Sequence, residues 1–219
     1  MAVTWNPADA QTTVVLSNGN LDTIGTASGS FACVRATLSH NAGAWYFEQF
    51  VVLGGGTTAV PGFADATTTL AGTSGSQFPG LFPNSGGISG TTAWNSGITR
   101  DIANPAITTN TNDVHMYAID FTNGKAWFGL NGTWQASVTP VVGGAGQVFH
   151  WTPPMTIFPC VGNDNSSKSR LHTLAANQAF AAPSGFSAWE AAAGGGADFR
   201  RSLSAFGARA GSRQVVGVS

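Results

Sequence analysis

Apolar and polar residues alternate most clearly between Val114 and Trp134, and this segment guides the interpretation of the rest of the chain. Two Asn-Gly pairs interrupt it, Asn123-Gly124 and Asn131-Gly132, each flanked by apolar and aromatic residues. Asn-Gly is favoured in two-residue type I′ hairpin turns, because both central residues of such a turn need a positive φ. The segment therefore predicts three short antiparallel strands joined by two tight turns.

The first of these turns also predicts a strand register. With a two-residue loop at Asn123-Gly124, the facing pairs are Thr122 and Lys125, Asp120 and Trp127, and Ile119 and Phe128. Since successive side chains of a strand point to opposite faces, the face expected to be core carries Tyr117, Ile119 and Phe121. The opposite face is also largely apolar and is expected to be covered; it carries Ala118, Asp120 and Trp127.

Further strands are predicted where β-branched and aromatic residues gather between turn residues. These predicted strands are Thr12–Leu16, Leu21–Ile24, Phe31–Ser39, Ala44–Leu53, Thr57–Ala64, Met155–Val161 and Leu171–Phe180. Ser17–Asn20 predicts another hairpin turn and Gly162–Ser169 a polar turn, while Ala188–Ala193 is interpreted as a short helical stub ended by glycines. Strands with turns about every ten residues are typical of an antiparallel sandwich.

The pattern weakens between Gly54 and Asn112, where Gly, Ser, Thr, Asn and Pro prevail. Loops of this length are uncommon in compact domains and are more often functional than accidental, so we expect a variable recognition surface here. A second Gly-rich loop is predicted at Pro140–Pro154. Large aromatic residues in such loops either anchor them to the core or form exposed contacts. The candidates for partner-binding loops are Phe78, Phe82, Trp94 and Trp151.

Composition excludes two function classes. Of the 219 residues only 9% are charged and the net charge is −1, so the chain has no basic surface of the kind that binds nucleic acid. A hydrophobic fraction of 42%, with 14 Phe and 7 Trp, suffices to build a core and argues against intrinsic disorder. What remains is one folded domain with a surface of small, mostly uncharged residues.

The sequence contains neither a basic segment followed by an apolar run at its N-terminus nor an apolar stretch long enough to span a membrane. We therefore expect synthesis in a cytosol and no membrane insertion. Cys33 and Cys160 could form one disulfide, but two buried free thiols are the preferred interpretation, and neither is given a redox role.

Residues that could hold a metal do not cluster in the sequence. The four histidines are scattered, with no His-x-x-x-His spacing and no His/Cys cluster, so neither a metal nor another cofactor is expected. Asp164, between Asn163 and Asn165, lacks the alternating acidic ligands and terminal Glu of a calcium loop, so a polar turn is the better interpretation.

A glycosidase would need a pair of carboxylates, and Glu48 and Asp120 are the candidates that lie on predicted strands. Because an unpaired buried charge is costly, we expect each to be satisfied by backbone N–H groups or by a partner such as Arg35. No Gly-x-Ser-x-Gly nucleophile turn and no phosphate-binding glycine loop is present. The chain is therefore predicted to be no enzyme, without catalytic residues.

Four sequence blocks in a fixed order resemble the SPRY domain family: VRATLSHNAGAWYFEQFVV, YAIDFTNGKAWFGLNGTW, IFPCV and AFAAPSGFSAW. Trp45, Tyr46 and Glu48 match the family's W-Y-x-E strand. The D-x-x-x-G-x-x-W-F-x-x-N-G-x-W block of the family is matched by Asp120, Gly124, Trp127, Phe128, Asn131, Gly132 and Trp134. The resemblance covers Trp5 to Trp189, and the chain departs from the family at Ala175–Gln178, where Asn-Phe-Gly is usual.

This resemblance implies an all-β fold, a two-layer antiparallel β-sandwich of the bent concanavalin-like type, in which the matching residues are scaffold positions. The SPRY-type domain would span residues 1–193, followed by a C-terminal extension at 194–219. The opening WNPADA and the block APSGFSAW are similar to the stand-alone SPRY proteins of bacteria and phages. The RING, B-box and SOCS-box neighbours of animal SPRY adaptors are absent from the sequence.

We therefore expect a non-enzymatic binding or structural module, specifically a phage-particle component such as a tail fibre, spike or capsid decoration that presents SPRY loops for host-surface or subunit recognition. Its partners would be other virion or assembly subunits and a host surface protein or glycan, and it would form a homo-oligomer. It would be made in the bacterial cytoplasm and located in the virion. The alternative is an intracellular, cytoplasmic SPRY adaptor that binds a short peptide of a partner protein.

The extension at 194–219 differs from the domain in charge. After Gly194–Gly196, residues 197–219 hold four basic side chains and the single acid Asp198, a charge of +3 against −4 for residues 1–196. Such a segment is either a disordered end or an arm that orders on a partner, and we expect an arm. Asp198 could cap a short helix, and Gln214–Val218 could add a strand to a neighbouring subunit's sheet. The assembly arm comprises Phe199, Arg200, Arg201, Leu203, Phe206, Arg209 and Arg213.

Overall fold

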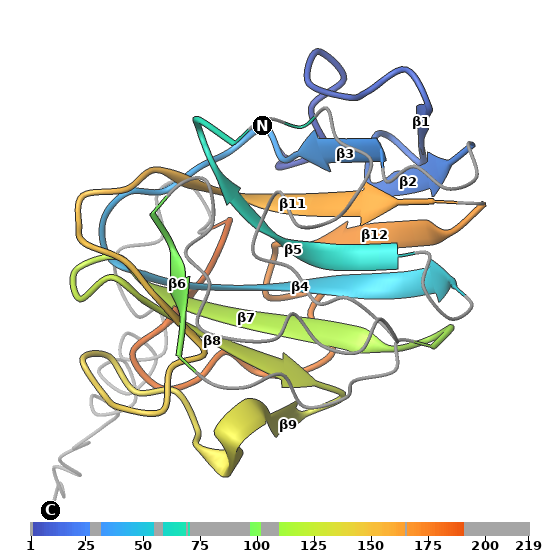
Figure 1. Ribbon diagram of the computed structural model, residues 1–219. Helices are drawn as coiled ribbons and strands as arrows, with labels where there is room; N and C mark the ends of the chain where they lie inside the picture. The colour runs from blue at the N-terminus through green and yellow to red at the C-terminus, as the bar shows by residue number, and fades with distance from the viewer. Residues whose placement is uncertain are drawn as a thin grey trace, which may run out of the picture.

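The computed structural model describes residues 2–26, 32–54, 59–68, 70, 97–101, 110–164 and 166–190. These residues form two antiparallel sheets packed face to face (Figure 1). The strands are β1 (Val14–Ser17), β2 (Asp22–Gly25), β3 (Ala32–Arg35), β4 (Ala44–Leu53), β5 (Ala59–Asp65), β6 (Thr99–Arg100), β7 (Val114–Asp120), β8 (Lys125–Leu130), β9 (Thr133–Trp134), β10 (Phe149–His150), β11 (Ile157–Asn163), β12 (Lys168–His172) and β13 (Ser187–Ala188). One short 3₁₀ turn, η2 (Gln135–Ser137), follows β9.

The larger sheet has the strand order β1-β2-β12-β4-β7-β8-β10-β6, with β9 paired to β8 and β13 paired in parallel to β4. The smaller sheet has the order β3-β11-β5. Neighbouring strands such as β12 and β4 are far apart in sequence, so the sheets are held together by pairing between distant segments, as expected of a β-sandwich. The predicted all-β, two-layer antiparallel fold is confirmed.

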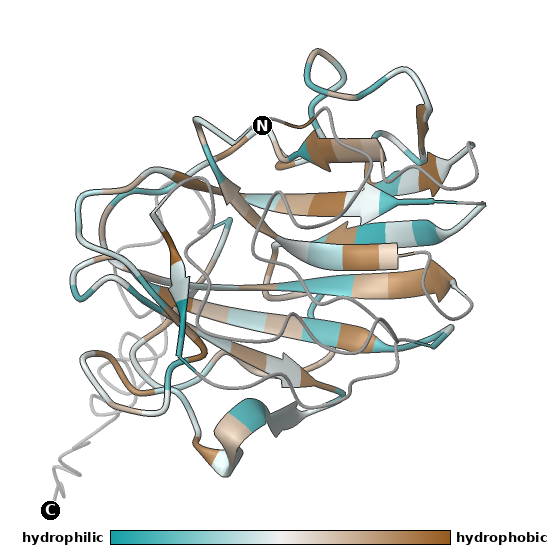
Figure 2. Cartoon of the chain, viewed as in Figure 1, coloured by the Kyte–Doolittle hydropathy of each residue, from teal (hydrophilic) through white to brown (hydrophobic). Residues whose placement is uncertain are grey.

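The main core lies between the two sheets. The residues predicted to be core, Tyr117, Ile119 and Phe121, are all buried in it. Opposite them, the smaller sheet contributes Val34, Phe63 and Val161. The hydropathy colouring shows apolar residues along the central strands of both sheets (Figure 2).

A second apolar cluster covers part of the outer face of the larger sheet. Trp127, Ala118 and Tyr46 are buried there, although they point away from the main core. The C-terminal segment 174–190 returns across this face, and the ring of Phe186 lies edge-on to Trp127 at a centroid distance of 5.9 Å. The prediction that this face is covered is confirmed for the centre of the sheet.

The two Asn-Gly turns differ in conformation. Asn131 and Gly132 have φ values of 49° and 84°, and Leu130 faces Thr133, so this predicted two-residue turn is confirmed. The register predicted from Asn123-Gly124 is wrong: the observed facing pairs are Asp120 and Lys125, Ile119 and Ala126, Ala118 and Trp127, and Tyr117 and Phe128.

The cause of the shifted register is the side chain of Asp120, which shapes a four-residue turn from Phe121 to Gly124. Its carboxylate accepts hydrogen bonds from the Asn123 backbone N at 3.1 Å and from Asn123 Nδ2 at 2.7 Å. Phe121 then inserts its ring into the core. Because the register shifts by an even number of residues, every side chain keeps its predicted face.

Two predictions near the C-terminus are corrected. The last long strand is Lys168–His172 rather than Leu171–Phe180, because the backbone turns after it, with Asn177 N donating to Leu174 O at 2.9 Å. Ala188, the first residue of the predicted helical stub, belongs to β13, since its backbone pairs with β4, and Trp189 and Glu190 are not helical either. Residues 191–193 of that stub and the arm at 194–219 lie outside the described residues.

Candidate functional site

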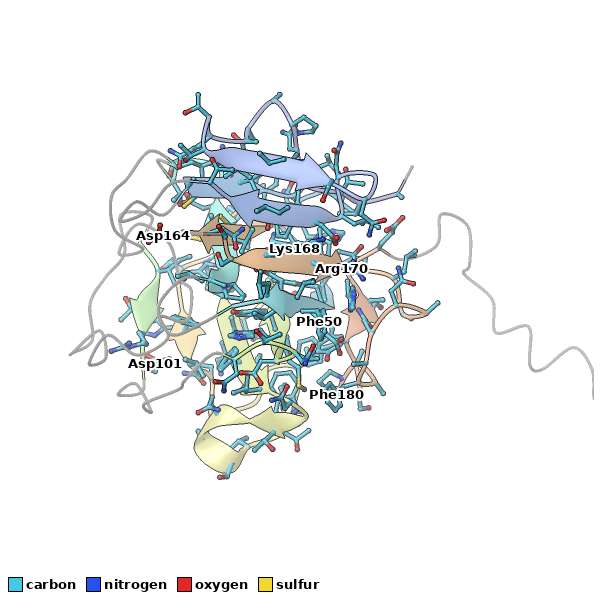
Figure 3. All side chains as sticks on the ribbon, turned by 90° about the vertical axis from the view of Figure 1, so that its right-hand side faces the viewer. Phe50, Asp101, Asp164, Lys168, Arg170 and Phe180 are labelled. Carbon is cyan, nitrogen blue, oxygen red and sulfur yellow. The ribbon has the colours of Figure 1, made fainter. Side chains whose placement is uncertain are left out.

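Four turns meet at one end of the sandwich, which we call the turn end and which faces the viewer in Figure 3. Its residues are Gly54, 110–113, Asn131–Gly132, and Asp164 with Ser166–Ser167. Thr111 joins two of these turns, because its Oγ1 donates to Gly54 O at 2.8 Å and accepts from Gly54 N at 3.1 Å. Gly25, the last residue of β2, is joined to them because its O accepts from Ser166 N and its N donates to Ser167 O.

Asp113 fixes the turn between β8 and β9 to the start of β7. Its Oδ2 accepts from Asn110 N at 2.6 Å, and its Oδ1 accepts from Asn131 Nδ2 at 2.7 Å. Asn131 Oδ1 in turn accepts from Val114 N at 2.8 Å. Each group therefore has a partner, so the positions of these turns are well defined.

Beneath the turn end, the interior of the sandwich is polar. The buried side chain of Asn163 donates to Thr23 Oγ1 at 2.6 Å and accepts from the hydroxyls of Ser167 and Ser169 at 3.1 and 3.2 Å. Gln49 spans the two sheets, because its Nε2 donates to Gly62 O and Cys160 O. Buried polar groups are retained at little cost only where they find such partners.

Next to the turn end, the outer face of the larger sheet is open over β1, β2, β12 and the end of β4. The outer-face patch is the set Val15, Ile24, Phe50, Leu53, Lys168 and Arg170. The strand registers place Val15, Ile24, Lys168 and Leu53 in one row across the sheet. The adjacent row runs through Ser17, Asp22, Arg170 and Phe50. Figure 3 shows Lys168 and Arg170 on β12 close to Phe50 on the neighbouring strand β4.

Leu53 and Val15 are exposed at 53% and 47% of their surface. A bulge in β4 contributes to the exposure of Leu53. Ser169 pairs with Val51, but Lys168 pairs with Leu53, so Val52 is an extra residue in β4. The bulge brings Leu53 beside Lys168, and a large apolar side chain thus lies next to a cation.

Both cations of the patch share a single carboxylate. Asp22 is 1% exposed and accepts from Arg170 Nε and Nη2 at 2.5 and 2.9 Å, while Lys168 Nζ lies 3.0 Å away. Burial raises the pKa of Asp22, but the hydrogen bonds and charges of Arg170 and Lys168 outweigh it, so the net pKa is lowered. Because Asp22 is buried and the two cations are partly exposed, this part of the surface presents positive charge.

Glu48, the first carboxylate of the considered glycosidase pair, is fully buried by structural contacts. It accepts from the backbone N of Ala179 at 2.7 Å and of Phe180 at 2.9 Å, and from Tyr46 Oη at 2.6 Å. Burial and then Glu48 raise the pKa of Tyr46, and burial lowers the pKa of His172, whose Nδ1 lies 4.0 Å from the carboxylate. Glu48 therefore holds the return segment on the outer face, and satisfaction by backbone N–H groups is confirmed.

Asp120 is likewise engaged by the backbone, since it accepts from Gly143 N at 2.8 Å in addition to Asn123. Arg35 is a partner of neither Glu48 nor Asp120, so that suggestion is wrong. The reason is layer geometry: Arg35 lies on β3 in the smaller sheet, whereas Glu48 and Asp120 lie on the larger one. Both carboxylates thus have structural roles in this fold.

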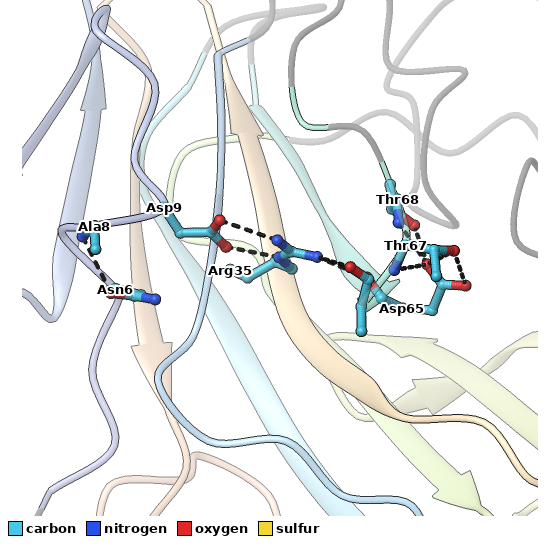
Figure 4. A network of polar contacts seen from close by, with 8 residues as sticks. Asn6, Ala8, Asp9, Arg35, Asp65, Thr67 and Thr68 are labelled. Carbon is cyan, nitrogen blue, oxygen red and sulfur yellow. Dashed lines mark hydrogen bonds and ion pairs between the residues drawn. The ribbon is translucent and has the colours of Figure 1, made fainter.

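Arg35 is instead the centre of a network on the smaller sheet (Figure 4). Its Nε and Nη2 bind Asp9 at 2.6 and 3.0 Å, its Nη1 donates to the carbonyls of Asp65 and Ala66, and the Asp9 hydrogen bond raises its pKa. The Asp65 carboxylate accepts from the backbone N of Thr67 and Thr68. The network ties the N-terminal segment to the residues that follow β5.

Of the four aromatic residues predicted in partner-binding loops, one lies among the described residues. Trp151 is 4% exposed and packs against Phe121 at a centroid distance of 6.2 Å, so it is positioned as a loop anchor rather than as an exposed contact. Phe78, Phe82 and Trp94 lie outside the described residues. So does the whole assembly arm, Phe199, Arg200, Arg201, Leu203, Phe206, Arg209 and Arg213.

The sequence pattern does not predict the outer-face patch. Lys168 falls in the predicted polar turn Gly162–Ser169, and Arg170 lies between that turn and the predicted strand Leu171–Phe180, so the pattern does not place them on a common face. The alternation Lys-x-Arg-x-His over Lys168–His172 is a period-two signal that could have placed both cations on one side of a strand. The bulge that exposes Leu53 has no comparable signal.

Cys33 and Cys160 are buried thiols that are not joined by a disulfide, as the preferred interpretation predicts, and burial raises the pKa of Cys33 to about 12. Within the described ranges, no group of three or more His, Cys, Asp or Glu side chains is arranged to hold a metal ion. The same part of the chain has no helix long and apolar enough to cross a membrane.

Comparison with known proteins gives matches in structure alone. No protein-family model matches the sequence, and no curated protein does. The SPRY domain of human HERC1 matches with a TM-score of 0.52 at 16% identity, over 77% of this chain and 96% of that domain. The TRIM65 PSpry domain matches with a TM-score of 0.50 at 12% identity, over 78% of this chain and 92% of that domain. The chain therefore adopts the bent β-sandwich fold of SPRY domains.

Proposed function

We propose that the chain is a non-enzymatic protein-binding module whose binding surface is the turn end together with the outer-face patch. The observation that carries the proposal is the patch itself: exposed apolar side chains and two partly exposed cations project from paired strands. Strands hold such side chains in place, so little order must be created on binding. SPRY domains in general are binding modules, which supports the same class of function.

A more specific proposal is that the module is a component of a phage-like particle and presents this surface to a host or to neighbouring subunits. Two observations support it: only 9% of the residues are charged, and many of the carboxylates are buried. Among the described acids, the buried ones are Asp22, Glu48, Asp65, Asp113, Asp120 and Asp164. The surface is therefore even less charged than the composition implies.

The same burial refines the proposal for the arm at 197–219. The arginines of the arm would need acidic partners, but most described carboxylates of the domain already have internal partners. In a homo-oligomer, the contacts of the arm would therefore rest mainly on Phe199, Leu203 and Phe206, and the arginines would serve a more acidic carrier subunit.

Co-fractionation tests the particle proposal. The full chain and a version lacking residues 197–219 would be produced alongside the assembling particle, and both would be followed through a density gradient. We expect both to show the same β-sheet circular dichroism and only the full chain to sediment with particles. Incorporation of the shortened chain at the same level would contradict the role of the arm, and absence of the full chain from particles would contradict the particle proposal.

The alternative is an intracellular adaptor that binds a short peptide, and the outer-face patch also favours this function. The discriminating measurement is proximity labelling with the full chain in the producing cell. Labelling of a single cellular protein, lost when Leu53 and Val15 are replaced by serine, would favour the adaptor. Labelling of particle subunits would favour the structural role.

A further inference from the structure

The outer-face patch has a regular geometry that specifies a partner more closely than binding in general. Val15, Ile24, Lys168 and Leu53 form one row across β1, β2, β12 and β4. Adjacent strands lie about 4.8 Å apart, so Val15 and Leu53 are about 14 Å apart with the Lys168 cation between them. The row therefore presents an apolar end, a positive centre and a second apolar end.

The exposed charge of this face is positive in the same place. The four strands direct two carboxylates toward it, Asp22 and Glu48, and both are buried and fully engaged. The Arg170 side chain is 36% exposed and that of Lys168 is 27% exposed, so both cations can accept a further anion. A carboxylate above Lys168 would find complementary charge, since Asp22 and Glu48, the acids of these four strands, are both buried.

An extended peptide matches this spacing. Alternate residues of a strand are about 6.7 Å apart and lie on one face, so three of them span about 13 Å. The geometry points to a partner segment in extended conformation with the pattern apolar-x-acidic-x-apolar, which lies across the strands of the patch. Its acidic side chain pairs with Lys168 and Arg170, and its apolar side chains pack on Leu53 and on Val15 with Ile24. This inference rests on the proposed binding function and names the class of ligand for that site.

The direct test is binding of a labelled, end-blocked peptide, Gly-Ser-Leu-Thr-Asp-Thr-Val-Ser-Gly, to the full chain by fluorescence anisotropy. We expect the peptide to bind, and we expect the same peptide with Asn in place of Asp to bind about tenfold more weakly at low salt. The difference should shrink as salt is raised. Equal binding of the two peptides, or no binding of the acidic one, would overturn the proposal.

Variants of the protein locate the site. Leu53→Ser, Val15→Ser and Lys168→Gln should each weaken binding of the acidic peptide by about tenfold. The matched control is Val141→Ser, because Val141 is exposed at 59% on the loop after η2, away from the patch, and should leave binding unchanged. Thermal unfolding of each variant checks that the fold is kept, and the Asp-to-Asn exchange in the peptide needs no change in the protein.

The outcomes separate this inference from the proposed function. If the patch variants bind the peptide as the parent does, the assigned site is wrong. If the full chain still joins particles or labels a partner while the acidic peptide does not bind, the ligand class is wrong and the binding function stands.

Discussion

The two ends of the sandwich are built from opposite kinds of side chain. At the turn end, buried Asn163, Thr23 and Ser169 are joined by hydrogen bonds between the sheets. At the other end, which we call the aromatic end, the rings of His40 and Trp45 stack at 3.8 Å and Trp189 lies edge-on to His40. The aromatic end gains stability from buried area, whereas the turn end gains a defined geometry from polar contacts.

The contrast teaches where this fold can vary. Aromatic packing tolerates little change of volume, and the ring of Trp189 contacts those of His40, Phe47 and Phe121 at this end. The turns at the opposite end are held by their backbones and by a few Asn and Asp side chains. Exposed positions beside those turns can therefore change without loss of the core, which suits a surface that must recognise a partner.

The largest effect is expected at the aromatic end. Trp189 is fully buried, contacts Phe47 and Phe121, and donates from Nε1 to Leu38 O. Trp189→Ala should lower the free energy of unfolding by about 3–5 kcal/mol, because it leaves a cavity and an unpaired carbonyl. Urea denaturation followed by tryptophan fluorescence measures this. A loss below about 1 kcal/mol would mean that Trp189 is not a core residue.

The next effect depends on pH and concerns His115, which lies on β7 near the turn end. Burial lowers its pKa from 6.5 to about 4, with Asp113 opposing the shift. Because the unfolded chain binds this proton more readily, stability should fall as the pH drops from 6.5 toward 4, by at most roughly 3 kcal/mol.

Urea midpoints at several pH values in that range would show this slope. His40 and His172 also have lowered pKa values and should add to it. His115→Gln should flatten the profile, and an unchanged profile in that variant would assign the pH dependence to the other two histidines.

A smaller effect is expected at the turn end from Asn131→Ala. The change removes the bonds to Asp113 and Val114 and places alanine at φ 49°, so we expect a loss of about 1–3 kcal/mol. Asn131→Gly is the matched control, because glycine relieves the backbone strain and still lacks the hydrogen bonds. If both variants are as stable as the parent, the hydrogen bonds of Asn131 to Asp113 and Val114 do not stabilise the turn end.

The smallest effect on stability should come from Leu53→Ser. Its side chain is more than half exposed, so the unfolding free energy should change by less than about 0.5 kcal/mol while peptide binding weakens by about tenfold. Parallel urea denaturation and binding assays would show this separation. A large loss of stability would place Leu53 in the core and would weaken the contrast between the two ends.

Local sequence signals predicted most strands, because alternation and turn residues act over a few positions. Asn131-Gly132 was sufficient to define its own turn. Asn123-Gly124 was not sufficient, because the Asp120 carboxylate accepts hydrogen bonds from Asn123 and stabilises a longer turn. Competition of this kind between a turn dipeptide and a neighbouring carboxylate is invisible to a rule that considers two residues at a time.

The candidate site was harder to predict, because it depends on pairing between distant segments. Asp22 and Lys168 are far apart in sequence and become neighbours only once β2 pairs with β12. For Trp151 the sequence leaves two roles open, loop anchor and exposed contact, and its burial favours the anchor. The arm and three of the loop aromatics lie outside the described residues, and their roles stay predictions.

The backbone N of Val3 donates to the Glu190 carboxylate at 3.1 Å, so the first and last described segments meet beside Trp189. The module can therefore be tethered from either direction at one pole while the opposite pole keeps its orientation. A reporter domain fused at either side would leave the patch accessible, and a circular permutant that joins these segments and opens at Asn18-Gly19 should retain the sandwich. Because the first and last described segments meet at one end, a carrier fused there would leave the outer-face patch directed away from it.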